Sequence, residues 1–349
     1  MKYKTGRIRI GRPMVVLLGS LFVMGQGVTA APATVATFGS GRDITVNQSA
    51  LYPETIAAGA DDRHFLLGSF REGAIYEVDM TGNARRLVQD KALHSVLGIF
   101  ADKRHNRLYA TNSDLGASLR SSADTVRRLA VIGVYDLTTG AVIEHVNLGA
   151  LLPDSPHLLN GITGDDLGNI YVTDSFSPVI YKIDQHGKAS VFLRSRQFEG
   201  PGINLNGIVY HPDGYLLVIK KSDGSLFRIP LHNPRAFARI KMGAAYAGGD
   251  GVALVDHNTV LIVANQTEKV RANSAYLLAS RDGWKTADEL DSHPLGDVYP
   301  TTGLIQNHRI YVLSSHLNRL IQASPQAQAQ LREKAVVRSL GKVSPSSNR

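Results

Sequence analysis

Asn206-Gly207-Ile208 is one copy of a phrase that recurs along the chain: a variable residue, then a glycine, then a branched aliphatic residue that opens a short apolar stretch. The other clear copies are Leu97-Gly98-Ile99, Asn160-Gly161-Ile162, Asp250-Gly251-Val252 and Thr302-Gly303-Leu304, and a looser copy is Glu54-Thr55-Ile56. The steps between successive copies are 43, 63, 46, 44 and 52 residues. A period of this length predicts a repeat architecture.

Two further apolar stretches follow most copies, rich in Val, Ile, Tyr and Leu and bounded by turn-forming residues, as is typical of β-strands. The predicted second strands are His64–Ser69, Arg107–Thr111, Asn169–Thr173, Tyr215–Ile219, Thr259–Ala264 and Arg309–Ser314. The predicted third strands are Ala74–Val78, Val131–Leu137, Val179–Ile183, Ser225–Ile229 and Ser274–Ala279. Because no amphipathic helix of crossover length precedes Pro325, a parallel α/β sheet is excluded. We therefore predict an all-β fold, a six-bladed β-propeller of four-stranded antiparallel blades.

The C-terminal region has a different composition from the repeats. Residues 325–337 form either one helix or a linker before a last strand at Ala335–Leu340. Propellers often close their ring by pairing the two chain ends, so we expect Thr34–Phe38 to pair with Ala335–Leu340. The tail from about residue 322 is expected to be partly helical or loosely packed.

The N-terminus has the order of a secretory signal peptide. Residues 1–13 carry five positive charges and no acid, an apolar run extends from Met14 to Met24, and small residues follow up to Ala30. This order predicts cleavage near Ala30, a single mature domain over residues 31–349 and a periplasmic or secreted location. The alternative is an uncleaved anchor or a buried helix, but an 11-residue run is short for a membrane span. We expect no integral membrane segment after cleavage.

Charge and cysteine content exclude several classes of function. The formal net charge is +8, but residues 1–13 contribute +5 and the tail from Gln322 contributes +4, which leaves the body near −1. A nucleic-acid partner is therefore not expected, since it calls for a basic surface on the folded body. With no cysteine in the chain, disulfides, thiolate metal sites and a cysteine nucleophile are excluded.

The variable residues of the repeat predict a metal site. In a propeller the first strand of each blade lies innermost, so Glu54, Leu97, Asn160, Asn206, Asp250 and Thr302 should form a ring at one mouth of the central channel. Four of them, Glu54, Asn160, Asn206 and Asp250, offer oxygen ligands of the kind preferred by Ca²⁺ or another hard divalent cation. The alternative is that Asn-Gly and Asp-Gly are ordinary turn dipeptides, although Glu54 is not explained in that way.

These phrases resemble those of the gluconolactonase and regucalcin, paraoxonase and strictosidine synthase-like propellers. The resemblance spans about residues 45–320 and rests on five stretches: Tyr52-Pro53-Glu54-Thr55-Ile56, Leu159-Asn160-Gly161-Ile162, Leu205-Asn206-Gly207-Ile208-Val209, Gly249-Asp250-Gly251-Val252 and Pro300-Thr301-Thr302-Gly303. In that family a Glu of the first blade, Asn residues of the middle blades and an Asp of the fifth bind a catalytic Ca²⁺. The resemblance implies that Glu54, Asn160, Asn206 and Asp250 are the corresponding ligands.

The resemblance also implies hydrolysis of a lactone or related ester. A bound Ca²⁺ would polarise the carbonyl and activate water. We expect Asp250 to accept the proton, Glu54 to be a ligand, and Asn160 to orient the substrate or complete the metal shell. Some relatives carry a histidine where this chain has Leu97. His94, His157 and Thr302 are therefore candidates for substrate contacts, although Thr302 offers only a hydroxyl.

The loops between second and third strands should determine which substrate binds. The loop at residues 113–130 carries Arg120, Arg127 and Arg128, and the loop at residues 266–274 carries Lys269 and Arg271. These cations would suit an anionic small molecule such as a sugar-acid lactone, unless the loops are simply solvated. Two other functions stay open: a binding propeller with a degenerate or absent metal site, and a strictosidine synthase-like lyase in which a Glu acts as base without a metal.

Overall fold

The computed structural model describes residues 36–265 and 273–343. The chain divides into two units, residues 1–33 and 34–349, and all the described residues belong to the second. The predicted signal peptide and the loop residues Lys269 and Arg271 lie outside the described residues. Among the described residues, no helix has the length and apolar character needed to cross a membrane.

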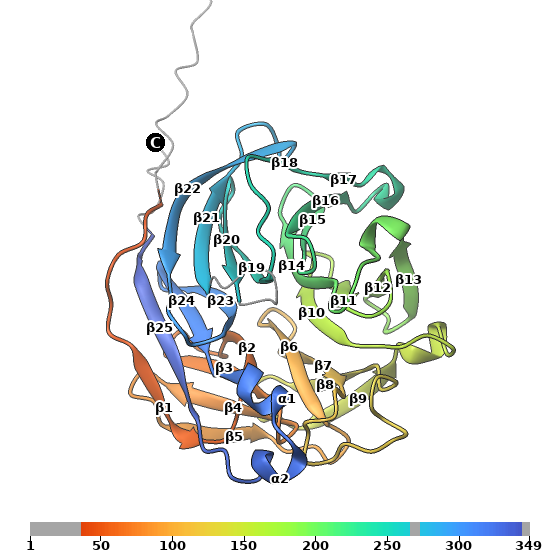
Figure 1. Cartoon of the computed structure of the whole chain (residues 1–349). Helices are drawn as coiled ribbons and strands as arrows, with labels where there is room; N and C mark the ends of the chain where they lie inside the picture. The colour runs from red at the N-terminus through yellow and green to blue at the C-terminus, as the bar shows by residue number, and fades with distance from the viewer. Residues whose placement is uncertain (1–35, 266–272, 344–349) are drawn as a thin grey trace, which may run out of the picture. The chain divides into compact units, whose positions relative to one another are not determined.

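The second unit is built of six sheets arranged around a common centre, and the first strand of each blade lies innermost (Figure 1). Blades one to three consist of β2 (Pro53–Ala58), β3 (His64–Ser69), β4 (Ala74–Asp79) and β5 (Ala84–Val88); β6 (Ser95–Asp102), β7 (Arg107–Ser113), β8 (Val131–Asp136) and β9 (Val142–Asn147); and β10 (Leu159–Gly164), β11 (Ile170–Asp174), β12 (Val179–Ile183) and β13 (Ala189–Arg194). Blades four to six consist of β14 (Leu205–His211), β15 (Tyr215–Lys220), β16 (Ser225–Pro230) and β17 (Ala238–Arg239); β19 (Gly249–Asp256), β20 (Thr259–Ala264), β21 (Ser274–Ala279) and β22 (Thr286–Pro294); and β23 (Pro300–Gln306), β24 (Arg309–Ser314), β25 (Lys334–Lys342) and β1 (Ile44–Ser49).

The predicted six-bladed β-propeller is thus confirmed. Pairing within the blades is antiparallel, and the fifth blade adds a two-residue strand, β18 (Lys241–Met242), which runs parallel to β22. Three short 3₁₀ helices, Gly149–Leu151, Arg196–Phe198 and Pro234–Ala236, lie in connections. Two helices, α1 (Leu317–Gln322) and α2 (Pro325–Gln328), connect β24 to β25.

Ring closure differs from the prediction in its N-terminal partner. The predicted last strand exists as β25, but it pairs with β1, where Ile44 lies opposite Val337, rather than with Thr34–Phe38. Residues 36–38 are not in a strand, although Gly39 donates a backbone hydrogen bond to Leu340. The alternation of buried and exposed side chains in β1 explains why this segment pairs with β25. Ile44 and Val46 are buried between the sixth and first blades, while Thr45 and Asn47 are exposed.

The core lies between blades. Six hydrophobic clusters occupy the six interfaces between neighbouring blades. In β15, Tyr215 and Leu217 face the fifth blade while Leu216 and Val218 face the third. Since successive side chains of a strand point to opposite faces, a strand between two neighbours must be apolar on both faces. This explains why the second strands are continuous apolar runs.

The repeat glycine is required by the close approach of neighbouring inner strands. A Cβ added at Gly161 would lie 2.5 Å from the carbonyl oxygen of Asn206, and one added at Gly207 would lie 2.6 Å from the backbone nitrogen of Val252. The neighbouring atoms belong to the backbone of the next blade, which has no flexible end that could move aside. The glycines of the repeat are therefore packing residues rather than turn residues.

We expect Gly161→Ala to destabilise the fold by about 1–3 kcal/mol, the usual cost of forcing extra atoms into a packed interior. The measurement is urea unfolding followed by circular dichroism. The matched control is Gly243→Ala, because an added Cβ there meets no atom within 4 Å, and its effect should stay below about 0.5 kcal/mol. Equal losses of unfolding free energy in the two variants would show that the close approach of the blades does not require a glycine at position 161.

Candidate functional site

Each inner strand carries a β-bulge at the position of the variable repeat residue. In β10, Leu159 pairs with Asp174 and Ile162 with Val172, so that Asn160 and Gly161 together lie opposite Thr173. The same register shift occurs in the other five blades. A bulge changes the direction of a side chain relative to the regular alternation. The six variable residues are thereby all directed to the central cavity.

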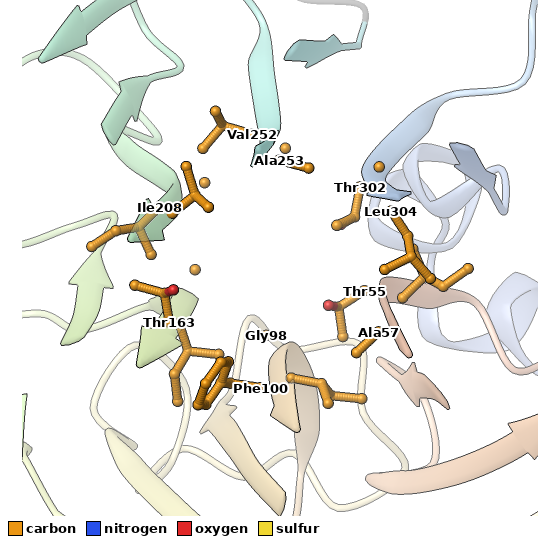
Figure 2. A pocket seen from close by; sticks show the side chains of 18 of the residues that line it. Thr55, Ala57, Gly98, Phe100, Thr163, Ile208, Val252, Ala253, Thr302 and Leu304 are labelled. Atoms are coloured by element: carbon orange, nitrogen blue, oxygen red, sulfur yellow. The ribbon is translucent and has the colours of Figure 1, made fainter. Parts of the chain in front are cut away.

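The central cavity has a volume of about 320 Å³ and is lined by the inner strands of all six blades. Figure 2 shows Thr55, Gly98, Thr163, Ile208, Val252 and Thr302 surrounding this common space. Apolar and small side chains line most of its length. The predicted ring residues, Glu54, Leu97, Asn160, Asn206, Asp250 and Thr302, all contribute to its wall at the end where the inner strands begin.

Asp250 is the most heavily hydrogen-bonded residue of the ring. One carboxylate oxygen, Oδ1, accepts a hydrogen bond from the side-chain amide of Asn206. The other, Oδ2, accepts a hydrogen bond from the side-chain amide of Asn265 and lies 3.0 Å from Nζ of Lys221. All of these side chains are buried, and Lys221 is only 8% exposed. Asp250 and Lys221 therefore form a buried ion pair inside a set of amides.

Lys221 and Asn265 were missed by the sequence analysis because they lie outside the repeat phrase. Each directly follows the second strand of its blade, as Ser175 does in the third blade. Backbone hydrogen bonds from Ser175 to Leu158, from Lys221 to Asn204 and from Asn265 to Gly248 hold all three at equivalent places. The sequence did contain a signal for these residues: a polar residue directly follows the apolar second strand in three blades, as Ser175, Lys221 and Asn265.

Glu54 differs from Asp250 in having no hydrogen-bond partner for its carboxylate among the described side chains. It is 6% exposed, and no described side chain donates to its carboxylate. Burial raises the pKa of Glu54 well above its ordinary value, the negative charge of Asp250 raises it further, and Lys221 opposes both effects. Burial also raises the pKa of Asp250, against the opposing effects of Lys221 and the two amides. The ring thus holds two buried carboxyl groups and one buried ammonium.

The remaining ring residues have structural partners. Asn160 donates from its amide to the hydroxyl of Ser175 at 3.2 Å, so its side-chain oxygen is not needed for that contact. The hydroxyl of Thr302 donates to the backbone carbonyl of Glu54 at 2.8 Å, which links the sixth blade to the first. Leu97 is buried and brings no polar group to the ring.

An apolar cluster adjoins the ring at the mouth of the channel. We call it the mouth cluster, and its buried members are Tyr52, Phe70, Leu97, Ala117, Leu158, Leu317 and Leu320. Leu97 belongs to the ring itself, and Tyr52 and Leu158 come just before ring residues in the sequence. Leu317 and Leu320 come from α1, so the C-terminal helix packs over this end of the channel. This cluster helps to shield the ring from water, and burial is the largest cause of the raised pKa values of Glu54 and Asp250.

The two predicted histidines do not line the central cavity. His157 Nδ1 lies 2.7 Å from the Asp174 carboxylate and its Nε2 lies 3.0 Å from the carbonyl of Leu152. The buried Asp174 therefore holds the pKa of His157 above its ordinary value despite burial, and the pair anchors the preceding loop. His94 is partly exposed, and its ring contacts the carbonyl of Ala92.

Two of the arginines predicted to contact an anionic substrate, Arg120 and Arg127, have other partners in the described part of the chain. Arg120 donates to the backbone carbonyls of Glu72 and Leu93. The guanidinium of Arg127 lies over the Phe176 ring, 4.4 Å from its centroid, and Arg127 and Arg128 line a separate surface pocket of about 660 Å³. None of the three lines the central cavity.

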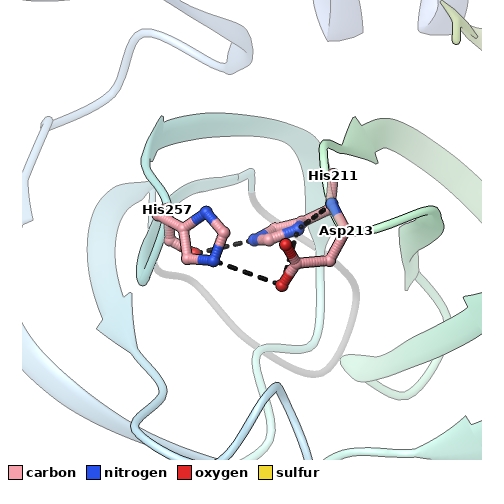
Figure 3. A group of neighbouring side chains, drawn as sticks. All are labelled: His211, Asp213 and His257. Carbon is pink, nitrogen blue, oxygen red and sulfur yellow. Dashed lines mark hydrogen bonds and ion pairs between the residues drawn. The ribbon is translucent and has the colours of Figure 1, made fainter. Parts of the chain in front are cut away.

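A second cluster of metal-ligating residue types, His211, Asp213 and His257, lies between the fourth and fifth blades (Figure 3). The buried His211 ring donates from Nε2 to the carbonyl of His257 at 2.7 Å, and its Nδ1 accepts from the backbone N–H of Asp213 at 3.1 Å. Both ring nitrogens are thus used, and no lone pair of this imidazole is available to a metal ion. The cluster joins two turns of neighbouring blades.

Because the pKa of Glu54 is raised, we predict that Glu54→Gln increases the free energy of unfolding in a pH-dependent way. Between the unfolded and the folded pKa, the folded chain holds a proton that the unfolded chain has released, so the wild type loses stability as pH rises above about 4.5. In metal-free buffer, Glu54→Gln should therefore be more stable than wild type at neutral pH and should lose this advantage near pH 4. Urea unfolding at several pH values measures the difference.

The control for this series is Glu144→Gln, at an exposed position of β9. Its effect on the free energy of unfolding should stay within about 0.5 kcal/mol throughout. A constant difference between wild type and Glu54→Gln across the pH range would contradict the raised pKa of Glu54 in the folded chain.

No protein-family model and no curated protein matches the sequence, whereas many solved structures match the fold. They include the major allergen Mala s 1 of Malassezia sympodialis, with a TM-score of 0.68, 16% identity and coverage of 87% of this chain and 97% of that chain. A protein provisionally assigned as a gluconolactonase has a TM-score of 0.58, 14% identity and coverage of 89% and 98%. Luciferin-regenerating enzyme has a TM-score of 0.56, 12% identity and coverage of 86% and 98%. The predicted resemblance to gluconolactonase-like propellers is therefore confirmed in the fold that this chain shares with these six-bladed structures.

Proposed function

We propose that this chain is a hydrolase that acts on a lactone or related ester with the help of a hard divalent cation, Ca²⁺ or a similar ion, at the mouth of the central channel. The observation that supports the proposal most is the pair of buried carboxyl groups, Glu54 and Asp250, directed to one cavity by equivalent bulges. One ammonium group, that of Lys221, does not balance two carboxylates. A bound cation would bring further positive charge to the two carboxyl groups.

The donors present fit a hard cation in chemical type. Glu54 and Asp250 offer carboxylate oxygens, and Asn160 and Asn206 offer amide oxygens, all of which Ca²⁺ accepts as ligands. A further buried oxygen, Oδ1 of Asn265, has no hydrogen-bond partner among the described residues. Since the amide nitrogen of Asn265 donates to Asp250, this unsatisfied oxygen lies beside the proposed site. Buried polar atoms without a partner are costly, and a cation would supply one.

The contacts favour a division of roles between the two carboxyl groups that reverses the prediction. Both oxygens of Asp250 accept hydrogen bonds, whereas the Glu54 carboxylate accepts none. We therefore assign proton transfer from the attacking water to Glu54, whose carboxylate accepts no hydrogen bond from a described side chain and whose pKa is raised by burial, and a holding role to Asp250. When bound, the cation would supply a Lewis acid that polarises the substrate carbonyl.

The surroundings of the site bear on the substrate. The central cavity and the mouth cluster are largely apolar, and none of the arginines of the loop at residues 113–130 lines the central cavity. A neutral lactone or ester therefore suits the described surface at least as well as the sugar-acid lactone expected from the sequence. The basic and then apolar N-terminal sequence supports export to the periplasm or the medium.

A second candidate is a binding propeller that uses no metal. The observation in its favour is the buried Lys221–Asp250 ion pair, because Lys221 already gives Asp250 a counter-charge at 3.0 Å. In that case the ring would be a structural network, and function would lie in the surface loops. Metal binding distinguishes the two candidates.

We expect wild type, stripped with a chelator and titrated calorimetrically, to bind one Ca²⁺ per chain. Glu54→Gln and Asp250→Asn should each weaken binding by more than about 100-fold, since even groups that only orient metal ligands contribute 10- to 100-fold. The control is Asp62→Asn, whose carboxylate is 73% exposed and pairs with Lys103. It should bind Ca²⁺ like wild type.

Hydrolysis is then measured on neutral alkyl lactones, aldonolactones and aryl esters, with Ca²⁺ and with chelator. Turnover that requires Ca²⁺ and is lost in both ring variants is the expected result. Absence of both metal binding and hydrolysis in the folded wild type would reject the hydrolase and leave the binding propeller.

A further inference from the structure

Lys221 is the cationic group closest to the two ring carboxyl groups, and the repeat pattern gave no indication of it. It is buried at the end of the second strand of the fourth blade, and its Nζ lies 3.0 Å from Oδ2 of Asp250. We propose that Lys221 is a built-in counter-cation that competes with the divalent cation for Asp250 and so sets the affinity of the site for metal. This inference rests on the proposed function, since it takes the ring as a cation site.

The geometry makes simultaneous occupation unfavourable. An ammonium at 3.0 Å from Asp250 takes the place beside Oδ2, and a Ca²⁺ ligand oxygen lies 2.3–2.6 Å from its ion. The two cations would then lie within a few ångströms of each other in a site whose residues are nearly inaccessible to solvent. Repulsion at that distance is screened far less than at a surface.

The charge balance leads to the same result. When both carboxyl groups are ionised, as ligands of a metal ion are, the charges of Glu54, Asp250 and Lys221 sum to −1. A divalent cation would change that sum to +1, whereas it would neutralise two carboxylates without the lysine. Each state with Lys221 therefore leaves one unbalanced charge, and the protein without Lys221 should hold a divalent cation more tightly.

Tyr299 gives the displaced ammonium a second position. Nζ of Lys221 already lies 5.6 Å from the centroid of the Tyr299 ring. A cation at the face of an aromatic ring is stabilised by the ring quadrupole, the more so when it is desolvated. The long, flexible stem of lysine allows its ammonium to move from Asp250 towards this ring without a change in the backbone.

The neighbouring Lys220 provides a matched control within the same strand end. It is also buried, but its ammonium bonds to the carbonyl of Glu199 at 2.6 Å and to Asp223 at 3.1 Å, away from the ring. Removal of either lysine deletes one buried positive charge from adjacent positions. Only removal of Lys221 changes the surroundings of Asp250.

The experiment titrates Ca²⁺ into chelator-stripped wild type, Lys221→Met and Lys220→Met by calorimetry, and records thermal unfolding of each with and without Ca²⁺. Lys221→Met should bind Ca²⁺ about 5- to 150-fold more tightly than wild type, the usual range for coupling between two ligands. Its unfolding temperature should also rise more on addition of Ca²⁺. Lys220→Met should bind like wild type.

Three outcomes would overturn the proposal. Equal affinity in wild type and Lys221→Met would reject competition while leaving the metal site intact. Weaker binding in Lys221→Met would show that the lysine supports the site. No binding in either folded protein would reject the metal site and the competition together.

A measurement on the unaltered chain covers the case in which Lys221→Met does not fold. Acetylation of Lys221 by an amine reagent, followed by mass spectrometry, should become faster when Ca²⁺ is added, because the ammonium leaves Asp250. Lys220 in the same peptide is the internal control and should not change. An unchanged rate at Lys221, with Ca²⁺ shown to be bound, would overturn the proposal.

Discussion

The close approach of neighbouring inner strands is the constraint on which the rest of this structure depends. The backbones of Asn160, Asn206, Asp250 and Thr302 pass next to the repeat glycines of the preceding blades, so that a Cβ at Gly161 would meet the carbonyl oxygen of Asn206. Hydroxyl groups fix the same approach from outside, as Thr173 Oγ1 does when it donates to the carbonyl of Asn206 at 2.6 Å. The bulge that follows from this packing directs one side chain per blade to the cavity. One local constraint therefore creates both the ring of strands and the ring of functional residues.

The sequence was sufficient to predict the fold because the repeat encodes this constraint directly. The spacing of the glycine phrases predicts the number of blades, and the apolar runs predict the second and third strands, because those strands are covered on both faces. The strand pairing that closes the ring was harder to predict from the sequence. It depends on which of several apolar stretches near the N-terminus fits against β25. Ile44–Ser49 pairs with β25 because Ile44 and Val46 fill the space between the sixth and first blades. Such non-local fit leaves no periodic signal.

The candidate site was predictable only where it coincides with the repeat. Glu54, Asn160, Asn206 and Asp250 occupy repeat positions, and the structure places them in the wall of one cavity. Lys221 and Asn265 lie one strand farther on in their blades, and an isolated lysine after an apolar strand is normally read as a solvated strand end. His94 and His157 lie three residues before ring positions, but nearness in sequence did not place them in the cavity. His157 is held instead by Asp174.

The electrostatics of the ring explain why a counter-cation is needed at all. Two carboxyl groups lie between an apolar cavity and the mouth cluster, where ionisation is opposed by burial. An isolated buried charge is strongly unfavourable, and the rigid close packing of the blades prevents the carboxyl groups from moving apart or reaching solvent. The charge must therefore be removed by protonation or balanced by a cationic group that comes to the carboxylates. A lysine side chain satisfies this at Asp250 but does not reach Glu54. That asymmetry leaves Asp250 with a counter-charge in direct contact, whereas the charge of Glu54 is removed either by the proton that its raised pKa favours or by a further cation that reaches the ring.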